Sequence, residues 1–141
     1  MKNSILEEIT FPAAIKKLKE VIEFLKKDMQ KHHLSEKAQF NMVVASEEIF
    51  SNISDYAYTE QGATVTIKTE LKDNLYSITF IDTGKKYNPL KHSDPDVETE
   101  MKDKDIGGLG IYLAKKLSDS QSYTYHNKQN ILTISIDINK C

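Results

Sequence analysis

The chain has 141 residues, which is enough for one domain with a single hydrophobic core. Its formal net charge is −2, so it lacks the basic excess that is typical of nucleic-acid-binding proteins. All 19 basic residues are lysines, which excludes bidentate recognition of a phosphate by an arginine of this chain.

The single cysteine, Cys141, excludes a disulfide within the chain. No apolar run approaches the roughly 20 residues needed to span a bilayer. The acidic N-terminal stretch also lacks the apolar core of a signal peptide. We therefore expect a soluble, cytoplasmic protein that contacts neither nucleic acid nor membrane.

The first half of the sequence predicts a strand and two helices. Residues 5–11 favour a β-strand, and Pro12 suits the first turn of a following helix. Apolar residues recur there at three- and four-residue steps, which indicates one buried helical stripe: Ile15, Leu18, Ile22, Leu25 and Met29. Ser35 is the predicted N-cap of a second helix, which we expect to end near Tyr58.

The second half predicts four strands, one helix and a long polar connection. Period-two alternation or β-branched residues favour strands at 63–71, 75–82, 122–126 and 131–138. A turn is expected at 127–130, and a helix at 109–117. The polar stretch at about 90–106 is long for a connection and is typical of a lid. The prediction is one domain over residues 1–141, an α/β two-layer sandwich (α+β) with helices on one face of a mainly antiparallel sheet.

Glu48 and Asn52 lie four residues apart at the edge of the apolar arc of the second helix. This spacing puts both side chains on one face, where the core would meet a cleft. A partly desolvated glutamate can act as a general base, and an amide oxygen can ligate magnesium. The same pair also fits ordinary boundary residues of an amphipathic helix, so the spacing alone does not decide.

Two glycine-bearing segments follow. Asp82 is predicted on the core face of its strand, where a buried carboxylate needs a donor such as the adenine amino group. Gly84 would let the chain turn beside a ligand, although a strand end followed by a turn explains both residues equally. The run 107–110, Gly-Gly-Leu-Gly, opens a predicted helix. It could present backbone N–H groups to phosphates or serve as a hinge.

The order of these segments resembles the GHKL ATPase superfamily, whose members share the Bergerat fold. Within it, the chain is similar to the anti-sigma-factor serine/threonine kinases and their stand-alone relatives. The resemblance is carried by 47–58 as the N box, 82–89 as the first glycine box and 106–113 as the second. It implies a Bergerat fold with an ATP lid, and ATP and Mg²⁺ as ligands.

The resemblance also implies a role for each matching residue. Glu48 would be the catalytic base, and Asn52 would hold Mg²⁺. The positions implied to bind ATP are Asn52, Asp55, Asp82, Gly84, Gly107, Gly108, Leu109, Gly110, Ile111 and Thr133. Asp82 would recognise adenine, while the glycine run would hold the phosphates. Thr133 matches a strand threonine near the adenine in many members, but alternation along its own strand puts it opposite Leu132 and Ile134.

The activity implied is phosphorylation of a serine or threonine on a STAS-domain antagonist protein. A homodimer of the chain would in addition sequester a sigma factor. The alternative is an ATP-sensing module of the same fold that binds partners without phosphotransfer. The lid of relatives often carries an arginine, where this chain has Lys91, Lys102 and Lys104, and this difference favours the alternative.

Overall fold

The computed structural model describes residues 5–57, 62–91 and 106–139, without the side chains at 56–57, 91 and 106–111. The elements in chain order are β1 (Ile5–Pro12), α1 (Leu18–Lys31), α2 (Glu36–Ala57), β2 (Thr64–Lys72), β3 (Leu75–Asp82), α4 (Ile106–Leu117), β4 (Ser120–His126) and β5 (Gln129–Asp137). Short 3₁₀ turns at Ile15–Lys17 and Pro89–Lys91 complete them. The predicted lid at about 90–106 lies almost entirely outside the described residues.

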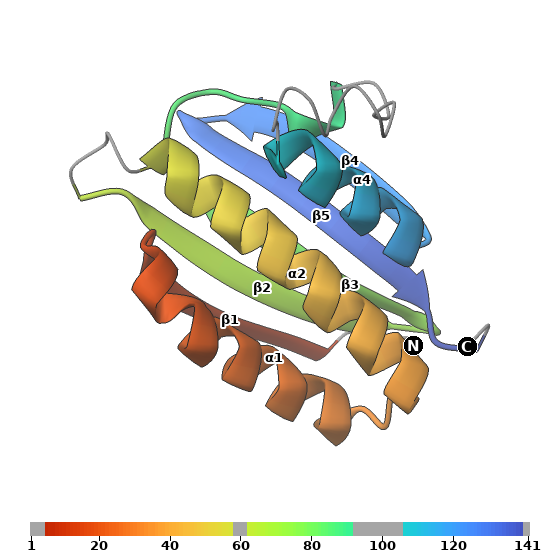
Figure 1. The fold of residues 1–141 in the computed structure, drawn as a ribbon. Coiled ribbons are helices and arrows are strands. Elements are labelled where there is room, and N and C mark those ends of the chain that lie inside the picture. Colours follow the sequence, from red (N-terminus) through yellow and green to blue (C-terminus); the bar gives the residue numbers. More distant parts are fainter. Residues whose placement is uncertain (1–4, 58–61, 92–105, 140–141) are drawn as a thin grey trace.

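The five strands form one sheet in the order β1-β2-β3-β5-β4, and all neighbouring strands are antiparallel. Helices α1, α2 and α4 lie on the same face of this sheet, with α2 between the other two (Figure 1). The predicted two-layer α+β sandwich with an antiparallel sheet is therefore confirmed. None of the described helices is long and apolar enough to cross a membrane.

The core lies between the sheet and the helices α1, α2 and α4, because alternate residues of the central strands face these helices. On β3, Tyr76, Ile78 and Phe80 are fully buried, and each pairs across β5 with an isoleucine or leucine. The last residue in this inward-facing series is Asp82, which is also buried. The hydrophobic pattern of the strand thus brings a carboxylate to the end of the core.

Pro12 lies at the end of β1, opposite Thr64, and not in the first turn of a helix as predicted. An edge strand tolerates proline, because the missing N–H can be one that faces away from the neighbouring strand. The second helix agrees more closely with the prediction. The hydroxyl of Ser35 accepts a hydrogen bond from the Ala38 N–H at 3.0 Å, as expected of an N-cap.

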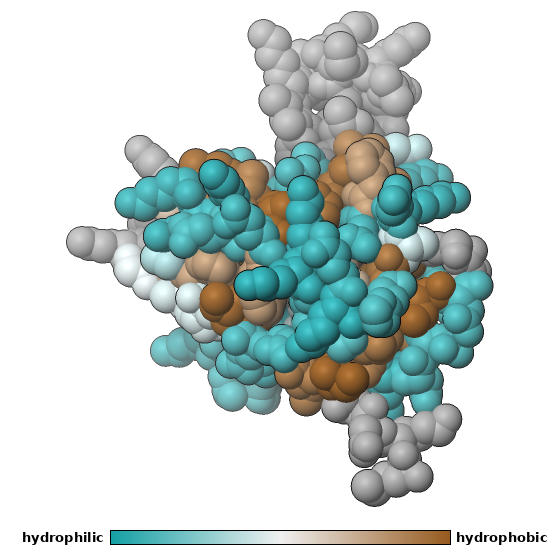
Figure 2. Space-filling model, turned by 90° about the horizontal axis from the view of Figure 1, so that it is seen from below, coloured by the Kyte–Doolittle hydropathy of each residue, from teal (hydrophilic) through white to brown (hydrophobic). Residues whose placement is uncertain are grey.

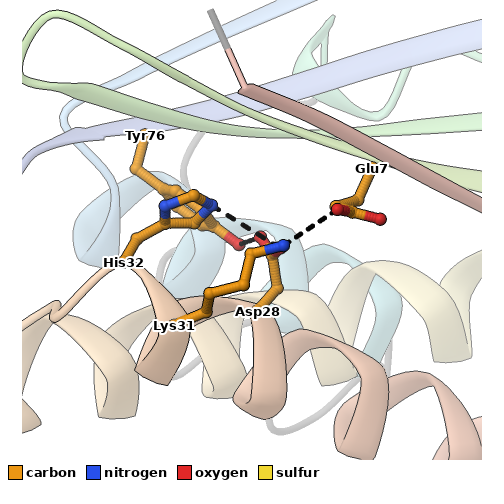
Figure 3. A network of polar contacts seen from close by, with 5 residues as sticks. All are labelled: Glu7, Asp28, Lys31, His32 and Tyr76. Carbon is orange, nitrogen blue, oxygen red and sulfur yellow. Dashed lines mark hydrogen bonds and ion pairs between the residues drawn. The ribbon is translucent and has the colours of Figure 1, made fainter.

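A buried polar network fixes the end of α1 to the sheet (Figure 3). The Tyr76 hydroxyl donates to Oδ2 of the buried Asp28 at 2.7 Å, and His32 Nε2 lies 3.7 Å from Oδ1 of the same carboxylate. At the exposed side of the network, Lys31 donates to Glu7 on β1 at 2.9 Å. These contacts join α1 to both an edge strand and a central strand.

The β4–β5 hairpin is tighter than the sequence suggested. Its turn consists of Asn127 and Lys128, both with positive φ (53° and 62°), as a two-residue type I′ turn requires. The predicted turn extended to residue 130, whereas β5 already begins at Gln129. This difference places Asn130 within the sheet, directly opposite Asp82 on β3.

Candidate functional site

A pocket of about 360 Å³, including its open mouth, lies between α2 and the ends of β3, β4 and β5. The pocket is lined by Ile49, Asn52, Ile53, Asp82, Lys85, Tyr87, Pro89, Tyr123, Asn130 and Leu132. Most of the wall is apolar or aromatic, and four of the lining residues are polar: Asn52, Asp82, Lys85 and Asn130. A mainly apolar wall with a few polar groups is usual for small-molecule sites.

Asp82 provides the only carboxylate among the described lining residues. It is 8% exposed, and its Oδ1 accepts hydrogen bonds from the Gly84 N–H at 2.9 Å and from Asn130 Nδ2 at 3.0 Å. Burial raises the pKa of Asp82, and the two hydrogen bonds partly oppose that rise. No described residue donates to Oδ2. One carboxylate oxygen is therefore held in place, while the other remains available to a ligand N–H.

Asn130 connects Asp82 to the turn that follows β3. Besides Asp82, its Nδ2 donates to the Lys85 carbonyl at 2.9 Å and, more weakly, to the Gly84 carbonyl at 3.4 Å. Its Oδ1 accepts from the Tyr87 N–H at 3.0 Å and from the Tyr123 hydroxyl at 2.5 Å. One buried side chain thus fixes the carboxylate and shapes the pocket wall. Asn130 was not among the predicted site residues, because it fell within the predicted turn.

On α2, the structure separates the predicted residues. Asn52 is buried and lines the pocket together with Ile49 and Ile53, and its amide has no hydrogen-bond partner among the described residues. Glu48 lies one turn earlier, half-buried, and is not among the lining residues. Asp55 is exposed and is also outside the pocket wall. An amide oxygen is therefore available inside the pocket, with a carboxylate about one helical pitch (~5 Å) away along α2.

The glycine run lies in the first turns of α4, which begins at Ile106, three residues before the predicted start. Gly107, Gly108, Leu109 and Gly110 are therefore helical. The side chains of Leu109 and Ile111 lie outside the described part of the structure. The predicted contact between this helix start and phosphates remains a prediction.

Thr133 is not among the residues that line the pocket, and it lies on the other face of the sheet. Alternation along β5 puts Asn130 and Leu132 on the helix-covered face and Thr133 on the opposite face. The Thr133 hydroxyl there shares a hydrogen bond of 2.9 Å with Thr79. The alternation along the strand thus predicted the face of Thr133 correctly, while its contact with ATP stays a prediction. The β5 residue that lies opposite Asp82 is Asn130.

Residues 11–136 match the histidine kinase-like ATPase domain, so the chain belongs to that family. Membership in a family of ATPase domains implies ATP as the nucleotide. The fold is similar to a solved structure described as the RsbU and RsbW domains of Rv1364c from Mycobacterium tuberculosis, with a TM-score of 0.69 and 15% identity. That alignment covers 95% of this chain but only 32% of the other, so this chain spans about a third of its length. No curated protein matches the sequence.

Proposed function

We propose that the pocket binds the adenine ring of ATP, with Asp82 as the group that recognises it. The observation that carries this proposal is that Oδ1 of Asp82 is held by Asn130 and Gly84, while no residue in the described part of the chain donates to its Oδ2. A carboxylate oxygen accepts a hydrogen bond from the adenine amino group and repels the keto oxygen that guanine has at that position. The apolar walls, which include Ile49 and Leu132, suit the faces of the ring.

The phosphates would extend from the adenine toward the start of α4 and Asn52. Backbone N–H groups at a helix N-terminus favour anions, and Gly107, Gly108 and Gly110 would allow close approach. The amide of Asn52, which has no hydrogen-bond partner among the described residues, suits Mg²⁺, because this ion typically takes few protein ligands and keeps its contacts to phosphate and water. The bound ion would supply neutralisation of phosphate charge. Asp55 is exposed, so any contribution to this region would be indirect.

Within that site we infer a protein kinase of the anti-sigma type. Glu48 would accept the proton of a serine or threonine hydroxyl on a STAS-domain antagonist as the γ-phosphoryl group of ATP is transferred to the oxygen. Its half-buried place one turn from Asn52 supports this role. A sigma factor would be a second partner, held by a homodimer in the cytoplasm.

The alternative is an ATP-controlled binding module that performs no phosphotransfer. Two observations favour it: Glu48 is outside the pocket wall, and the chain has no arginine to stabilise transferring phosphate charge. ATP would then act only by changing the affinity for a partner.

The two functions are separated by incubating the protein with a STAS-domain antagonist, magnesium and γ-labelled ATP. The kinase proposal predicts phosphoserine or phosphothreonine on the antagonist and loss of label by at least about a hundredfold in Glu48→Gln, because a general base contributes about 10²–10⁴ in rate. Glu70→Gln, on the uncovered face of the sheet, is the matched control and should keep full activity. Labelling that persists in Glu48→Gln would refute the role of this residue. ATP-dependent capture of the antagonist without labelling would instead establish the binding module.

A further inference from the structure

An open groove runs between α1 and α2 on the outer surface of the helical layer. Two depressions that share Lys26 and Glu47 form it, and neither shares a lining residue with the nucleotide pocket. Its apolar lining is Leu18, Ile22, Phe40, Val43 and Val44. The side of the molecule that carries α1 is mostly hydrophilic, with hydrophobic patches between polar side chains (Figure 2). Phe40 is 66% exposed, so this groove offers apolar surface to a partner.

The two rims of this α1–α2 groove differ in charge. Lys19 and Lys26 line the α1 rim, with Glu23 between them, whereas Glu36 and Glu47 line the α2 rim. None of these five side chains forms an ion pair with another described residue. The groove therefore combines an apolar floor with one mainly basic rim and one acidic rim, and its charges are free to pair with a partner.

The backbone of the groove restricts the kind of occupant. Both walls are helices, whose N–H and C=O groups are already bonded internally, so an extended peptide would find no strand edge to pair with. A helix satisfies its own backbone and can lay one apolar stripe between two others. A second copy of the same concave surface would leave a void, which packing disfavours. The convex shape of a single helix fits better.

We propose that the α1–α2 groove binds an amphipathic helix of a partner protein. Its apolar stripe covers Phe40 and Val43, its acidic flank faces the lysines of α1, and its basic flank faces Glu36 and Glu47. The acidic rim runs from Glu36 to Glu47 on α2, 11 helical steps or about 16 Å, so a partner helix of about three turns spans it. Binding of this helix is independent of the nucleotide pocket and of phosphotransfer.

Three synthetic peptides of about 15 residues, a length of about four helical turns, test the proposal by NMR titration of the ¹⁵N-labelled protein. All carry leucines at three- and four-residue steps. One has an acidic and a basic flank, one has two acidic flanks, and one has two basic flanks. The mixed peptide is expected to bind most tightly and to shift backbone signals along the groove, including Phe40 and Val43. Phe40→Ser should weaken binding of the mixed peptide about tenfold or more, as expected for a residue at the centre of a contact. The protein should stay folded, because the Phe40 side chain is exposed.

A change of rim charge tests the role of each flank. Lys19→Glu combined with Lys26→Glu makes both rims acidic, so the preference should move from the mixed peptide to the peptide with two basic flanks. Lys68→Glu combined with Lys72→Glu changes the net charge equally on the uncovered face of the sheet and should leave the preference unchanged. Equal binding of all three peptides, or signal shifts outside the groove, overturns the proposal. Concentration-dependent self-association that Phe40→Ser abolishes would assign the surface to a second copy instead.

Discussion

Replacement of Asn130 by alanine should damage both the stability of the fold and the affinity for ATP. The substitution removes four hydrogen bonds of 3.0 Å or less, which join Asn130 to Asp82, Lys85, Tyr87 and Tyr123. It also leaves the buried Oδ1 of Asp82 with one donor in place of two. The change thus acts on the group that would recognise adenine without touching its charge.

The magnitude follows from the burial of these groups. A hydrogen bond contributes about 0.5–1.5 kcal/mol net, and a buried group left without a partner costs about 1–3 kcal/mol. Tyr123 is only half-buried, so water can replace that contact in part. We expect a loss of about 2–4 kcal/mol in the free energy of unfolding. Without Asn130 the carboxylate of Asp82 loses its fixed orientation. The affinity for ATP should therefore fall by at least about tenfold, which corresponds to about 1.4 kcal/mol.

Urea denaturation without nucleotide gives the stability, and calorimetric titration with magnesium-ATP gives the affinity. Thr133→Val is the control, because it removes a single hydrogen bond from the opposite face of the same strand. Thr133→Val should lower the free energy of unfolding by about 0.5–1.5 kcal/mol and leave the affinity for ATP unchanged. The reasoning would be refuted if Asn130→Ala stayed within about 1 kcal/mol of the unaltered protein, the scale of one hydrogen bond, and bound ATP equally well.

Three further predictions concern the core, a helix end and pH. Tyr76→Phe should lower the free energy of unfolding by about 1–3 kcal/mol, because it leaves the buried Asp28 without its hydroxyl donor. Urea denaturation measures this loss, and an unchanged free energy of unfolding would mean that water replaces the hydroxyl. Ser35→Ala should lower the free energy of unfolding by about 0.5–2 kcal/mol, because it removes the N-cap hydrogen bond of α2. Ser35→Asp should restore the lost stability, because aspartate is also a good N-cap. Because the folded-state pKa of Asp82 is raised, its contribution to stability is fully present below pH 3.8 and is lost as pH rises through the raised pKa. ATP affinity should show the opposite trend and fall on acidification. Urea denaturation over the same pH range should find the stability component absent in Asp82→Asn.

The strands and the core were predictable because they depend on local pattern. The alternation in β2 and β3 identified the faces that turn inward, including the face that carries Asp82. The same rule placed Thr133 on the outer face of β5, and the structure agrees. The N-cap at Ser35 was predictable for the same local reason.

The features that could not be predicted depend on contacts between distant residues or on one turn. Asn130 and Asp82 are 48 positions apart, and they meet only because the β4–β5 turn has two residues. A polar residue next to a predicted turn gives no sign that it belongs to a strand. Asp28 and Tyr76 are likewise 48 positions apart, and their hydrogen bond depends on how α1 packs on the sheet. The available signal in the sequence was Asn127, because asparagine favours the positive φ that a two-residue turn requires.

The central claim is that Asp82 recognises the adenine of ATP, and comparison of magnesium-ATP with magnesium-GTP in thermal denaturation tests it most directly. At an ATP concentration of about 100 times the Kd, ATP should stabilise the folded protein by about 2.7 kcal/mol. For a chain of this size that corresponds to a rise in Tm on the order of 10 °C. GTP should give little or no rise, and Asp82→Asn should lose the response to ATP. Equal responses to ATP and GTP, or an unchanged response in Asp82→Asn, would contradict the claim.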